Sequence, residues 1–449
     1  MLSAQFRKQH LQKKLVFGLG QTGFSCVRFL VQHGFEVAVF DTRANPPLAE
    51  QLYREFPNVE LTLQSVSEAL FEDVDQIVLS PGISVKSPLL TVANDRNIRI
   101  VGDIELFALC AQAPVIGITG SNGKTTTTTL IAEMFSSAGL KVETGGNIGT
   151  PVLDLLNRPV PDYYVLELSS FQLETTRSLT PYVALILNIS ADHMDRYENL
   201  KEYGDAKFSI LNGAHHKLIN IDDPWLKTQL EKINGYVGFT ENSPEKGTYG
   251  LLSSDGLLWI ASANRKIFKV TELKLQGRHQ LMNAVAAAAV ADLCKINKQV
   301  IAKVLSQFNG LEHRTQLVAT VNGVNYINDS KGTNIGATIA AINGLDSTII
   351  LIAGGDGKGA DFSELAGGVK DKVRYAILFG RDAGKIEKAI GQVTNVMRAV
   401  NLESAVSQAS EIAVKGETVL LSPACASFDM FDNYQHRGDV FIEAVRGLE

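Results

Sequence analysis

The chain has 449 residues, more than one hydrophobic core normally holds, so two or three domains are expected. With 45% hydrophobic and 20% charged residues and a net charge of −6, the composition excludes a disordered chain and a dedicated nucleic-acid-binding protein. The four cysteines form no C-x-x-C pair, which argues against a zinc site or disulfide framework and favours a reducing, cytoplasmic environment. Residues 1–14 are basic without an apolar segment behind them, and no run of about 18 apolar residues occurs, so neither export nor a membrane span is expected.

The first block alternates short β-branched apolar runs with amphipathic segments. We predict strands at residues 14–20, 36–41 and 75–82 and a helix at residues 23–33. This βαβ rhythm indicates a parallel sheet with helices on both faces.

Two further α/β blocks follow, and each contains apolar runs that end in small or turn-forming residues. The second block contains a predicted helix at residues 103–111, strands at 114–119, 163–168 and 182–190, and an Ala-rich helix at 282–294. The third contains predicted strands at residues 324–330, 348–355, 375–380 and 417–424. We therefore expect three α/β domains, over residues 1–102, 103–310 and 311–449.

The sequence GSNGKT at residues 120–125 is the strongest single motif. It follows the predicted strand 114–119 and begins a helix, so its backbone amides and the helix N-terminus can bind phosphates. Lys124 can reach the β and γ phosphates, and the Thr125 hydroxyl can hold Mg²⁺. Ile118 stands where the strict Walker pattern has glycine, so the motif is a variant P-loop.

A second glycine-rich turn, GLGQTG at residues 18–23, follows a predicted strand and begins a helix. Asp41 closes the next strand about 20 residues on, which nearly completes the dinucleotide-binding fingerprint. Taken alone, the fingerprint favours an NAD-dependent dehydrogenase. The same turn suits any nucleotide diphosphate, including UDP, because it binds the pyrophosphate while the acid binds a ribose or base. The fingerprint predicts the shape of the ligand and leaves its identity open.

Three further side chains are candidates for binding metal or handling charge. Glu167 ends a predicted strand, where P-loop proteins place an acid near Mg²⁺, although a structural carboxylate is equally compatible with this spacing. His193 lies just beyond the predicted strand 182–190, where loops gather ligands, although a lone loop histidine is more often structural. Lys207 falls on an amphipathic helix, where a solvated lysine is the default.

Several segments in chain order support a family assignment: TGSNGKTT, LELSSFQL, NISADHMDRY, YGDAK, LEHR, NDSKGTN, GGDGKGADF and SPACASFD. Together they resemble the Mur ligase family over nearly the whole chain. The resemblance implies an ATP-dependent amide ligase of bacterial peptidoglycan and cell-wall synthesis, a pathway that supports cell shape and division. It implies a Rossmann-like UDP-binding domain, a central P-loop ATPase-type domain with a parallel or mixed sheet, and a C-terminal dinucleotide-binding-like domain that receives the amino acid.

The resemblance also implies the nucleotide and metal sites. ATP would contact Gly120, Ser121, Asn122, Gly123, Lys124, Thr125 and Thr126, with adenosine contacts from Asn283, Arg314 and Asp329. Two Mg²⁺ ions would be held by Thr125, Glu167, His193 and Lys207, the last carrying CO₂ as a carbamate. Lys124, Glu167, His193 and Lys207 would be the catalytic residues.

The last three segments resemble in particular the family members that add D-glutamate to UDP-N-acetylmuramoyl-L-alanine through an acyl phosphate. UDP-sugar contacts would fall on Gln21, Thr22, Asp41, Arg43, Gly82 and Asn147. The glutamate site would comprise Thr333, Lys358, Ser427 and Phe428, with Lys331 at the junction of the substrates. We expect a cytoplasmic monomer.

Two positions depart from the family pattern. Gln280 stands where the H-N-x-x-N motif before the Ala-rich helix has its first asparagine, which leaves an adenine contact from that amide open. Tyr434 stands where a phenylalanine is expected, which preserves the packing but adds a hydroxyl.

Alternative functions explain less of the sequence. A dehydrogenase would leave TGSNGKTT without a role, and a regulatory GTPase would need N-K-x-D, whereas residues 297–300 read NKQV. A ligase of the same family that adds another amino acid, or a folylpolyglutamate synthase, is the closest alternative, and the C-terminal motifs argue against it. A non-catalytic binding protein would have no use for ATP, two metals and an acceptor.

Overall fold

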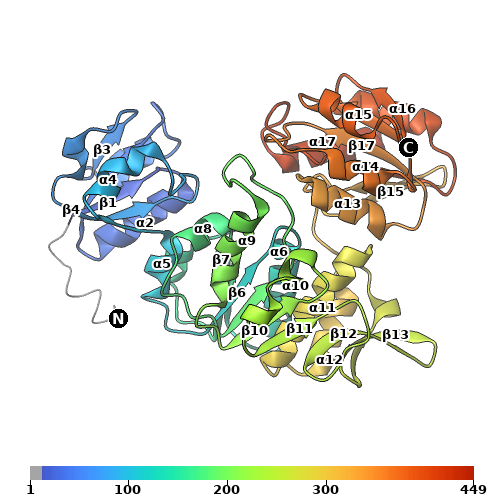
Figure 1. The fold of residues 1–449 in the computed structure, drawn as a ribbon, viewed down its shortest axis with the longest axis horizontal. Helices are drawn as coiled ribbons and strands as arrows, with labels where there is room; N and C mark the ends of the chain where they lie inside the picture. The colour runs from blue at the N-terminus through green and yellow to red at the C-terminus, as the bar shows by residue number, and fades with distance from the viewer. Residues whose placement is uncertain (1–12, 449) are drawn as a thin grey trace.

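The computed structural model describes residues 13–448, and residues 1–12, part of the segment in which no export signal was predicted, lie outside the described residues. Three separate β-sheets follow one another along the chain. Figure 1 shows the N-terminal and C-terminal sheet units on opposite sides of the central unit. The prediction of three successive α/β units is confirmed.

The N-terminal sheet has five parallel strands in the order β3-β2-β1-β4-β5. Its strands are β1 (Lys13–Phe17), β2 (Glu36–Asp41), β3 (Glu60–Leu63), β4 (Val74–Leu79) and β5 (Arg99–Val101). The accompanying helices are α2 (Gln21–Gln32), α3 (Ala49–Glu55) and α4 (Thr91–Asp95), with 3-10 turns η1 (Glu68–Phe71) and η2 (Pro88–Leu90), and α5 (Asp103–Ala108) then leads into the central unit. The helix predicted at residues 23–33 begins two residues earlier, at Gln21. β1 ends at Phe17, so the next residue, Gly18, with φ +94°, already forms the turn.

The central sheet has nine strands in the order β14-β13-β12-β11-β10-β9-β6-β8-β7. Its strands are β6 (Val115–Thr119), β7 (Val142–Gly146), β8 (Tyr163–Glu167), β9 (Val183–Ile186), β10 (His216–Asn220), β11 (Tyr236–Phe239), β12 (Thr248–Ser254), β13 (Leu257–Ser262) and β14 (Arg265–Lys269). Its helices are α6 (Lys124–Ser137), α7 (Val152–Leu155), α8 (Ser170–Glu174), α9 (Leu200–Phe208), α10 (Pro224–Lys227), α11 (Arg278–Leu293) and α12 (Lys298–Gln307), with 3-10 turns η3 (Ser209–Leu211), η4 (Leu230–Lys232) and η5 (Val270–Glu272).

The central sheet is mixed, one of the two arrangements expected for it, because one edge is antiparallel. β12, β13 and β14 pair as hairpins, whereas the strands from β7 to β12 pair in parallel. The turn between β12 and β13 contains Asp255 and Gly256, both with positive φ, and Asp-Gly is a strong hairpin signal. The Ala-rich helix α11 begins at Arg278, four residues before its predicted start.

The C-terminal sheet has six strands in the order β15-β16-β20-β17-β18-β19, and every pair except β15–β16 is parallel. Its strands are β15 (Gln316–Val321), β16 (Val324–Asn328), β17 (Ile349–Gly354), β18 (Val373–Phe379), β19 (Asn395–Arg398) and β20 (Thr418–Leu421). Its helices are α13 (Ile335–Gly344), α14 (Ser363–Val369), α15 (Ala383–Ile390), α16 (Leu402–Ile412) and α17 (Tyr434–Arg446).

The N-terminal and central units share one apolar core. A single cluster of buried side chains contains Val16 and Phe24 from the first unit together with Leu155, Tyr164 and Ile186 from the second. Within residues 13–448, the buried clusters of the C-terminal unit draw only on residues from 324 onward. Apolar burial therefore fixes the first two units to each other, while the third is attached mainly by other contacts.

The glycine-rich turn between β1 and α2 allows a direct test of this packing. An added Cβ at Gly23 would lie 1.8 Å from Gly18 O and 2.8 Å from Ser80 Oγ, whereas one at Gly20 would meet nothing within 4 Å. We expect Gly23→Ala to lower the free energy of unfolding by roughly 1–3 kcal/mol through overpacking, and Gly20→Ala, the matched control, to leave it nearly unchanged. Thermal denaturation followed by circular dichroism measures both, and equal melting temperatures for the two variants would contradict this packing.

Candidate active site

The glycine-rich loop at residues 120–123 connects β6 to α6. Gly120 and Gly123 have φ angles of +148° and +84°, which residues with a Cβ rarely adopt. α6 begins without a side-chain cap, so its first backbone N–H groups have no intrahelical partner and can bind phosphate oxygens. The Lys124 ammonium donates to Gly120 O at 2.7 Å and Ser121 O at 2.9 Å, and burial lowers its pKa. Backbone donors and a cation thus meet at the end of a central strand.

A hydroxyl and a carboxylate face each other beside this loop. Thr125 Oγ1 donates to Glu167 Oε2 at 2.8 Å, and Asn147 Nδ2 donates to the other carboxylate oxygen at 2.9 Å. Arg314, predicted to contact adenosine, donates from Nη2 to Thr125 Oγ1 at 2.6 Å. The guanidinium therefore reaches the phosphate loop from the segment that precedes β15, and it also lines a cavity beside that loop.

Lys207 is buried on α9 with 2% of its surface exposed, so the default expectation of a solvated lysine is wrong here. Its ammonium donates to Gly120 O at 3.0 Å, and the same oxygen accepts from Lys124. Burial and then the Lys124 charge lower the pKa of Lys207 well below its ordinary value. A lysine in this environment has a larger uncharged fraction, which is the form that reacts with CO₂.

His193 lies on the loop that follows β9, in a left-handed conformation with φ +58°. Its imidazole ring lies edge-on to Phe171, with ring centroids 4.8 Å apart, and Nε2 is 3.7 Å from Asp192 Oδ2. Burial lowers the pKa of the imidazole, which favours the neutral form that binds metals.

The side chains predicted to bind metal do not form a closed protein cage. Across the part of the chain that the structure describes, no three His, Cys, Asp or Glu side chains are grouped to hold a metal ion. Thr125 and Glu167 nevertheless place two oxygens 2.8 Å apart beside the phosphate loop. This donor set fits Mg²⁺, which commonly binds proteins through one or two carboxylates and completes its shell with phosphate oxygens and water.

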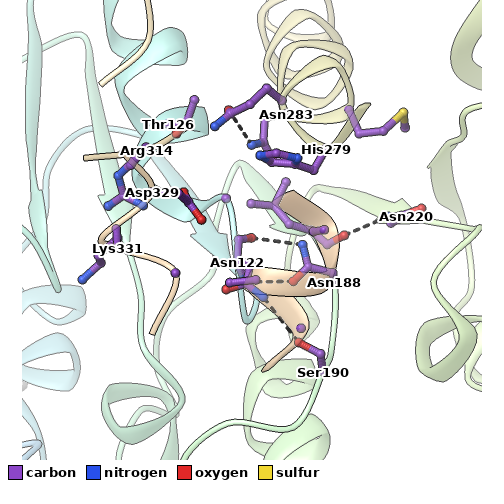
Figure 2. Close-up of a pocket in the computed structure, with 18 of the residues that line it drawn as sticks. Asn122, Thr126, Asn188, Ser190, Asn220, His279, Asn283, Arg314, Asp329 and Lys331 are labelled. Carbon is purple, nitrogen blue, oxygen red and sulfur yellow. Dashed lines mark hydrogen bonds between the residues drawn. The ribbon is translucent and has the colours of Figure 1, made fainter. Parts of the chain in front are cut away.

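A cavity of about 300 Å³ adjoins the phosphate loop between the central and C-terminal units. Figure 2 shows Asn122, Asn283 and Arg314 around it from three separate segments. Of the residues predicted to bind the nucleotide, those that line it are Asn122, Gly123, Thr126, Asn283, Arg314 and Asp329. Gln280, the departure noted in the sequence, also lines it and accepts from Asn283 Nδ2 at 3.1 Å. This glutamine therefore orients the amide that packs against Gly123.

Asp329 and Lys331, which follow β16, also line this cavity. Asp329 accepts from Ser422 Oγ at 2.8 Å, and burial raises the pKa of its carboxyl to about 6. Burial and the neighbouring Arg314 lower the pKa of Lys331 to about 8, and its ammonium lies 4.1 Å from the centroid of the Tyr434 ring. Tyr434, the second departure, keeps the aromatic face against this lysine.

A second cavity, of about 440 Å³, lies at the carboxyl edge of the N-terminal sheet. The structure brings together here all six residues predicted to contact the UDP-sugar: Gln21, Thr22, Asp41, Arg43, Gly82 and Asn147. Burial alone would raise the pKa of the Asp41 carboxyl, but hydrogen bonds from Arg43 and the Leu19 N–H lower it to about 2. Asp41 is therefore charged at neutral pH and fixes the glycine-rich turn.

Ser80 and Gln172 line the same cavity and were missed by the sequence analysis. Ser80 directly follows β4, at the sheet edge where ligands of open α/β sheets bind. Gln172 forms a capping box with Ser169 on α8, and its Nε2 donates to the buried Asp103 at 2.9 Å. The capping pattern predicts a helix start, but only the packing of α8 against the N-terminal unit brings this amide to the cavity.

A third cavity, of about 170 Å³, lies between the His193 loop and the C-terminal unit. Thr333 and Lys358 line it together with His193, as the predicted amino-acid site requires. Lys331 instead lines the nucleotide cavity. Ser427 is buried on the neighbouring loop, whereas the Phe428 side chain is 72% exposed. That loop pairs with the Lys358 loop through two backbone hydrogen bonds between Asp356 and Ala426, of 3.0 and 2.8 Å.

Arg437 of α17 connects two loops that contribute residues to this third cavity. It is fully buried, and its guanidinium donates to Ser330 O at 2.8 Å and to Cys425 O at 3.1 Å. Burial lowers its pKa to about 10. Because these acceptors are neutral, the group positions two loops with hydrogen bonds and carries a desolvated charge.

Three family models match successive parts of the chain. A MurD-like N-terminal domain of Mur ligases matches residues 12–102, the Mur ligase middle domain matches 118–291, and the Mur ligase glutamate ligase domain matches 313–425. The chain is 44% identical to the UDP-N-acetylmuramoylalanine–D-glutamate ligase of Nitrosococcus oceani, over 100% of this chain and 99% of that protein. It is 47% identical to the enzyme of the same name from Marinobacter nauticus, over 97% and 98% of the two chains.

Solved structures share the fold at low sequence identity. The pseudomurein peptide ligase type C from Methanothermus fervidus has a TM-score of 0.62 at 20% identity, over 98% of this chain and 100% of that one. The MurF ligase from Thermotoga maritima in complex with ADP also has a TM-score of 0.62, at 15% identity, over 98% and 96% of the chains. Fold and site thus define a three-unit α/β protein with a phosphate-binding loop. The chain belongs to the Mur ligase family, whose members are ATP-dependent amide ligases.

The buried guanidinium of Arg437 supports a stability prediction. Arg437→Met would leave the carbonyls of Ser330 and Cys425 buried without donors, so we expect it to lower the free energy of unfolding by roughly 2–5 kcal/mol. Arg446→Met on the exposed end of the same helix is the control and should have little effect. Urea denaturation compares the two, and an Arg437 variant as stable as the control would show that the two loops do not depend on this group.

Proposed function

We propose that this Mur ligase joins D-glutamate to the carboxylate of UDP-N-acetylmuramoyl-L-alanine in an ATP-dependent step of peptidoglycan precursor synthesis. The observation that carries the proposal is a shared wall: Ser190 and Gly336 line both the nucleotide cavity and the amino-acid cavity. A phosphorylated intermediate formed on one side of this wall would lie within reach of an amine bound on the other. The full-length relatives at 44% and 47% identity carry the name of this reaction.

Activation by phosphate solves the chemical problem of amide formation, because hydroxide is too poor a leaving group. In the proposed first step, the UDP-linked carboxylate attacks the γ-phosphorus of ATP, and the bond between that phosphorus and the oxygen that bridges the β and γ phosphates breaks. ADP is released, and the carboxylate becomes an acyl phosphate. The Lys124 ammonium and the N–H groups of α6 offset the charge on the transferring group. Arg314, through its position at Thr125, adds a second cation at the same end of the loop.

The proposed reaction uses two Mg²⁺ ions beside the loop. Thr125 and Glu167 would hold one, and His193 together with a Lys207 carbamate formed from CO₂ would hold the other. Bound Mg²⁺ would neutralise phosphate charge and polarise the acyl oxygen. The carbamate would convert a desolvated cation into an anionic oxygen ligand.

In the proposed second step, the neutral amine of D-glutamate attacks the acyl carbon, and the tetrahedral intermediate expels phosphate. Recognition of the amino acid must therefore fall on its carboxylates. Lys358 supplies a cation and Thr333 a hydroxyl in the amino-acid cavity. Ser427 and the backbone amide of Phe428 would act as further donors once substrate is bound, and Lys331 would contact the junction of the substrates.

The proposed location of the protein in the cell follows from its proposed substrates. Within residues 13–448, every helix is too short or too polar to cross a membrane. ATP and a UDP-linked sugar are substrates of the cytoplasm, and we propose that the protein acts there as a monomer. We also propose domain boundaries near residues 102 and 310.

An amino-acid panel tests the proposed reaction. We expect phosphate release from ATP with UDP-N-acetylmuramoyl-L-alanine only when D-glutamate is added. Lys358→Ala would leave a bound carboxylate unpaired and should raise the KM for D-glutamate by an amount equivalent to about 2–5 kcal/mol, with the KM for ATP and for the UDP-sugar nearly unchanged. Lys388→Ala, an exposed lysine of the same unit, is the control. Turnover with a different amino acid would overturn the substrate assignment.

The carbamate is tested separately at Lys207. Lys207→Ala should be nearly inactive, and a short-chain carboxylic acid added to the assay should restore part of the rate by supplying the missing oxygen ligand. Lys201→Ala, which removes an exposed lysine from the same helix, should retain activity. Full activity of Lys207→Arg would contradict the carbamate, because a guanidinium does not take up CO₂ in this way.

A further inference from the structure

Arg196 connects the loop that carries His193 to the wall of the UDP cavity. Its Nη1 donates to Pro81 O at 2.5 Å, and its Nη2 donates to Ile83 O at 3.3 Å. These two carbonyls flank Gly82, which lines the UDP cavity with its neighbours. One guanidinium thus spans from a loop of the central unit to a loop of the N-terminal unit.

The guanidinium is also held from the central unit. Nη2 donates to Glu174 Oε2 at 2.6 Å, and the group lies over the Phe171 ring at 3.9 Å from its centroid. The side chains of Arg196 and Glu174 are only 10% and 12% exposed. A planar, charged group that is stacked on a ring and hydrogen-bonded at its edge has little rotational freedom.

The same aromatic ring contacts the predicted metal ligand. Phe171 packs edge-on against His193 with a centroid distance of 4.8 Å, so Arg196 and His193 both contact this ring. The Arg196 guanidinium therefore links the loop at residues 81–83 to the ring that His193 contacts. Arg196 itself is outside the residues that line the UDP, nucleotide and amino-acid cavities.

We propose that Arg196 is a positioning residue that fastens the loop at residues 81–83 to the His193 loop, and so aligns the UDP-linked carboxylate with the phosphate loop. The inference rests on the proposed function, since it takes the cavity of the N-terminal unit to bind the UDP-sugar. Loss of this connection would misplace one substrate and leave the sites for ATP and D-glutamate intact.

The chain supplies a matched control at the same boundary. Lys86 of the N-terminal unit bridges to Glu198 at 2.8 Å and to Glu202 at 2.6 Å in the central unit. Its side chain is 50% exposed, and exposed ion pairs contribute little. If any ionic link between the units sufficed, Lys86→Gln and an Arg196 variant would behave alike.

The experiment compares Arg196→Lys, Arg196→Met and Lys86→Gln in the full chain. Steady-state kinetics give kcat and the KM for each of the three substrates, and calorimetry gives the Kd for UDP-N-acetylmuramoyl-L-alanine without turnover. For Arg196→Lys we expect a melting temperature near that of the wild type, a loss of kcat/KM for the UDP-sugar between about tenfold and a hundredfold, and KM values for ATP and D-glutamate within about twofold. Arg196→Met should show the larger defect, and Lys86→Gln should match the wild type.

Each outcome either supports or overturns the positioning role of Arg196. Arg196→Lys kinetics indistinguishable from those of Lys86→Gln would overturn the proposal, and so would an equal loss of affinity for all three substrates, which would indicate a general structural role. A wild-type chain that binds no UDP-N-acetylmuramoyl-L-alanine would instead overturn the proposed function. The wild-type measurement thus separates failure of the inference from failure of the function on which it rests.

Discussion

Two ammonium groups, a buried one and a partly buried one, meet at one carbonyl oxygen, and the chemistry of the site depends on this contact. Gly120 O accepts from Lys124 at 2.7 Å and from Lys207 at 3.0 Å, so two cations are held against one loop. Burial lowers the pKa of both, and their mutual repulsion adds to it for Lys207. Such a site favours a polyanionic ligand or the conversion of one amine into an anion. The proposed phosphate binding and the proposed carbamate would both relieve the same electrostatic constraint.

The units are joined by contacts of two different kinds. The first two share an apolar cluster, which cannot be separated without exposing large side chains to water. The third reaches the phosphate loop through polar groups: Asn334 Nδ2 donates to Asn122 Oδ1 and to Asp192 Oδ2, both at 3.1 Å, and Arg314 donates to Thr125. Polar contacts exchange with water or ligand at a smaller net change in free energy. The cavity proposed to bind the UDP-sugar thus lies beside an apolar junction, whereas the cavity proposed to bind the amino acid lies beside a polar one.

The glycine-rich turn at residues 18–23 shows how much a local motif can predict about a ligand. Its geometry is that of a dinucleotide-binding turn, with Asp41 hydrogen-bonded to the Leu19 N–H at 2.7 Å. Nothing in that geometry separates NAD from UDP, because both present a pyrophosphate and a ribose. Membership of the Mur ligase family, established over the whole chain, removes the dehydrogenase and the GTPase as readings of its glycine motifs.

The sequence by itself determined the three α/β units and the phosphate loop, because each depends on local periodicity or on turns at the ends of strands. The six residues that the structure gathers around the cavity of the N-terminal sheet were predicted through the resemblance to the Mur ligase family. Only the tertiary structure decided the burial of Lys207, the reach of Arg314 to Thr125 and the contribution of Gln172 to the UDP cavity. These features join residues far apart in the chain, and they depend on how whole elements pack. From the sequence alone, a lysine on a polar helix is predicted to be exposed to solvent. The periodicity of one helix carries no information about the loops from elsewhere in the chain that pack over it.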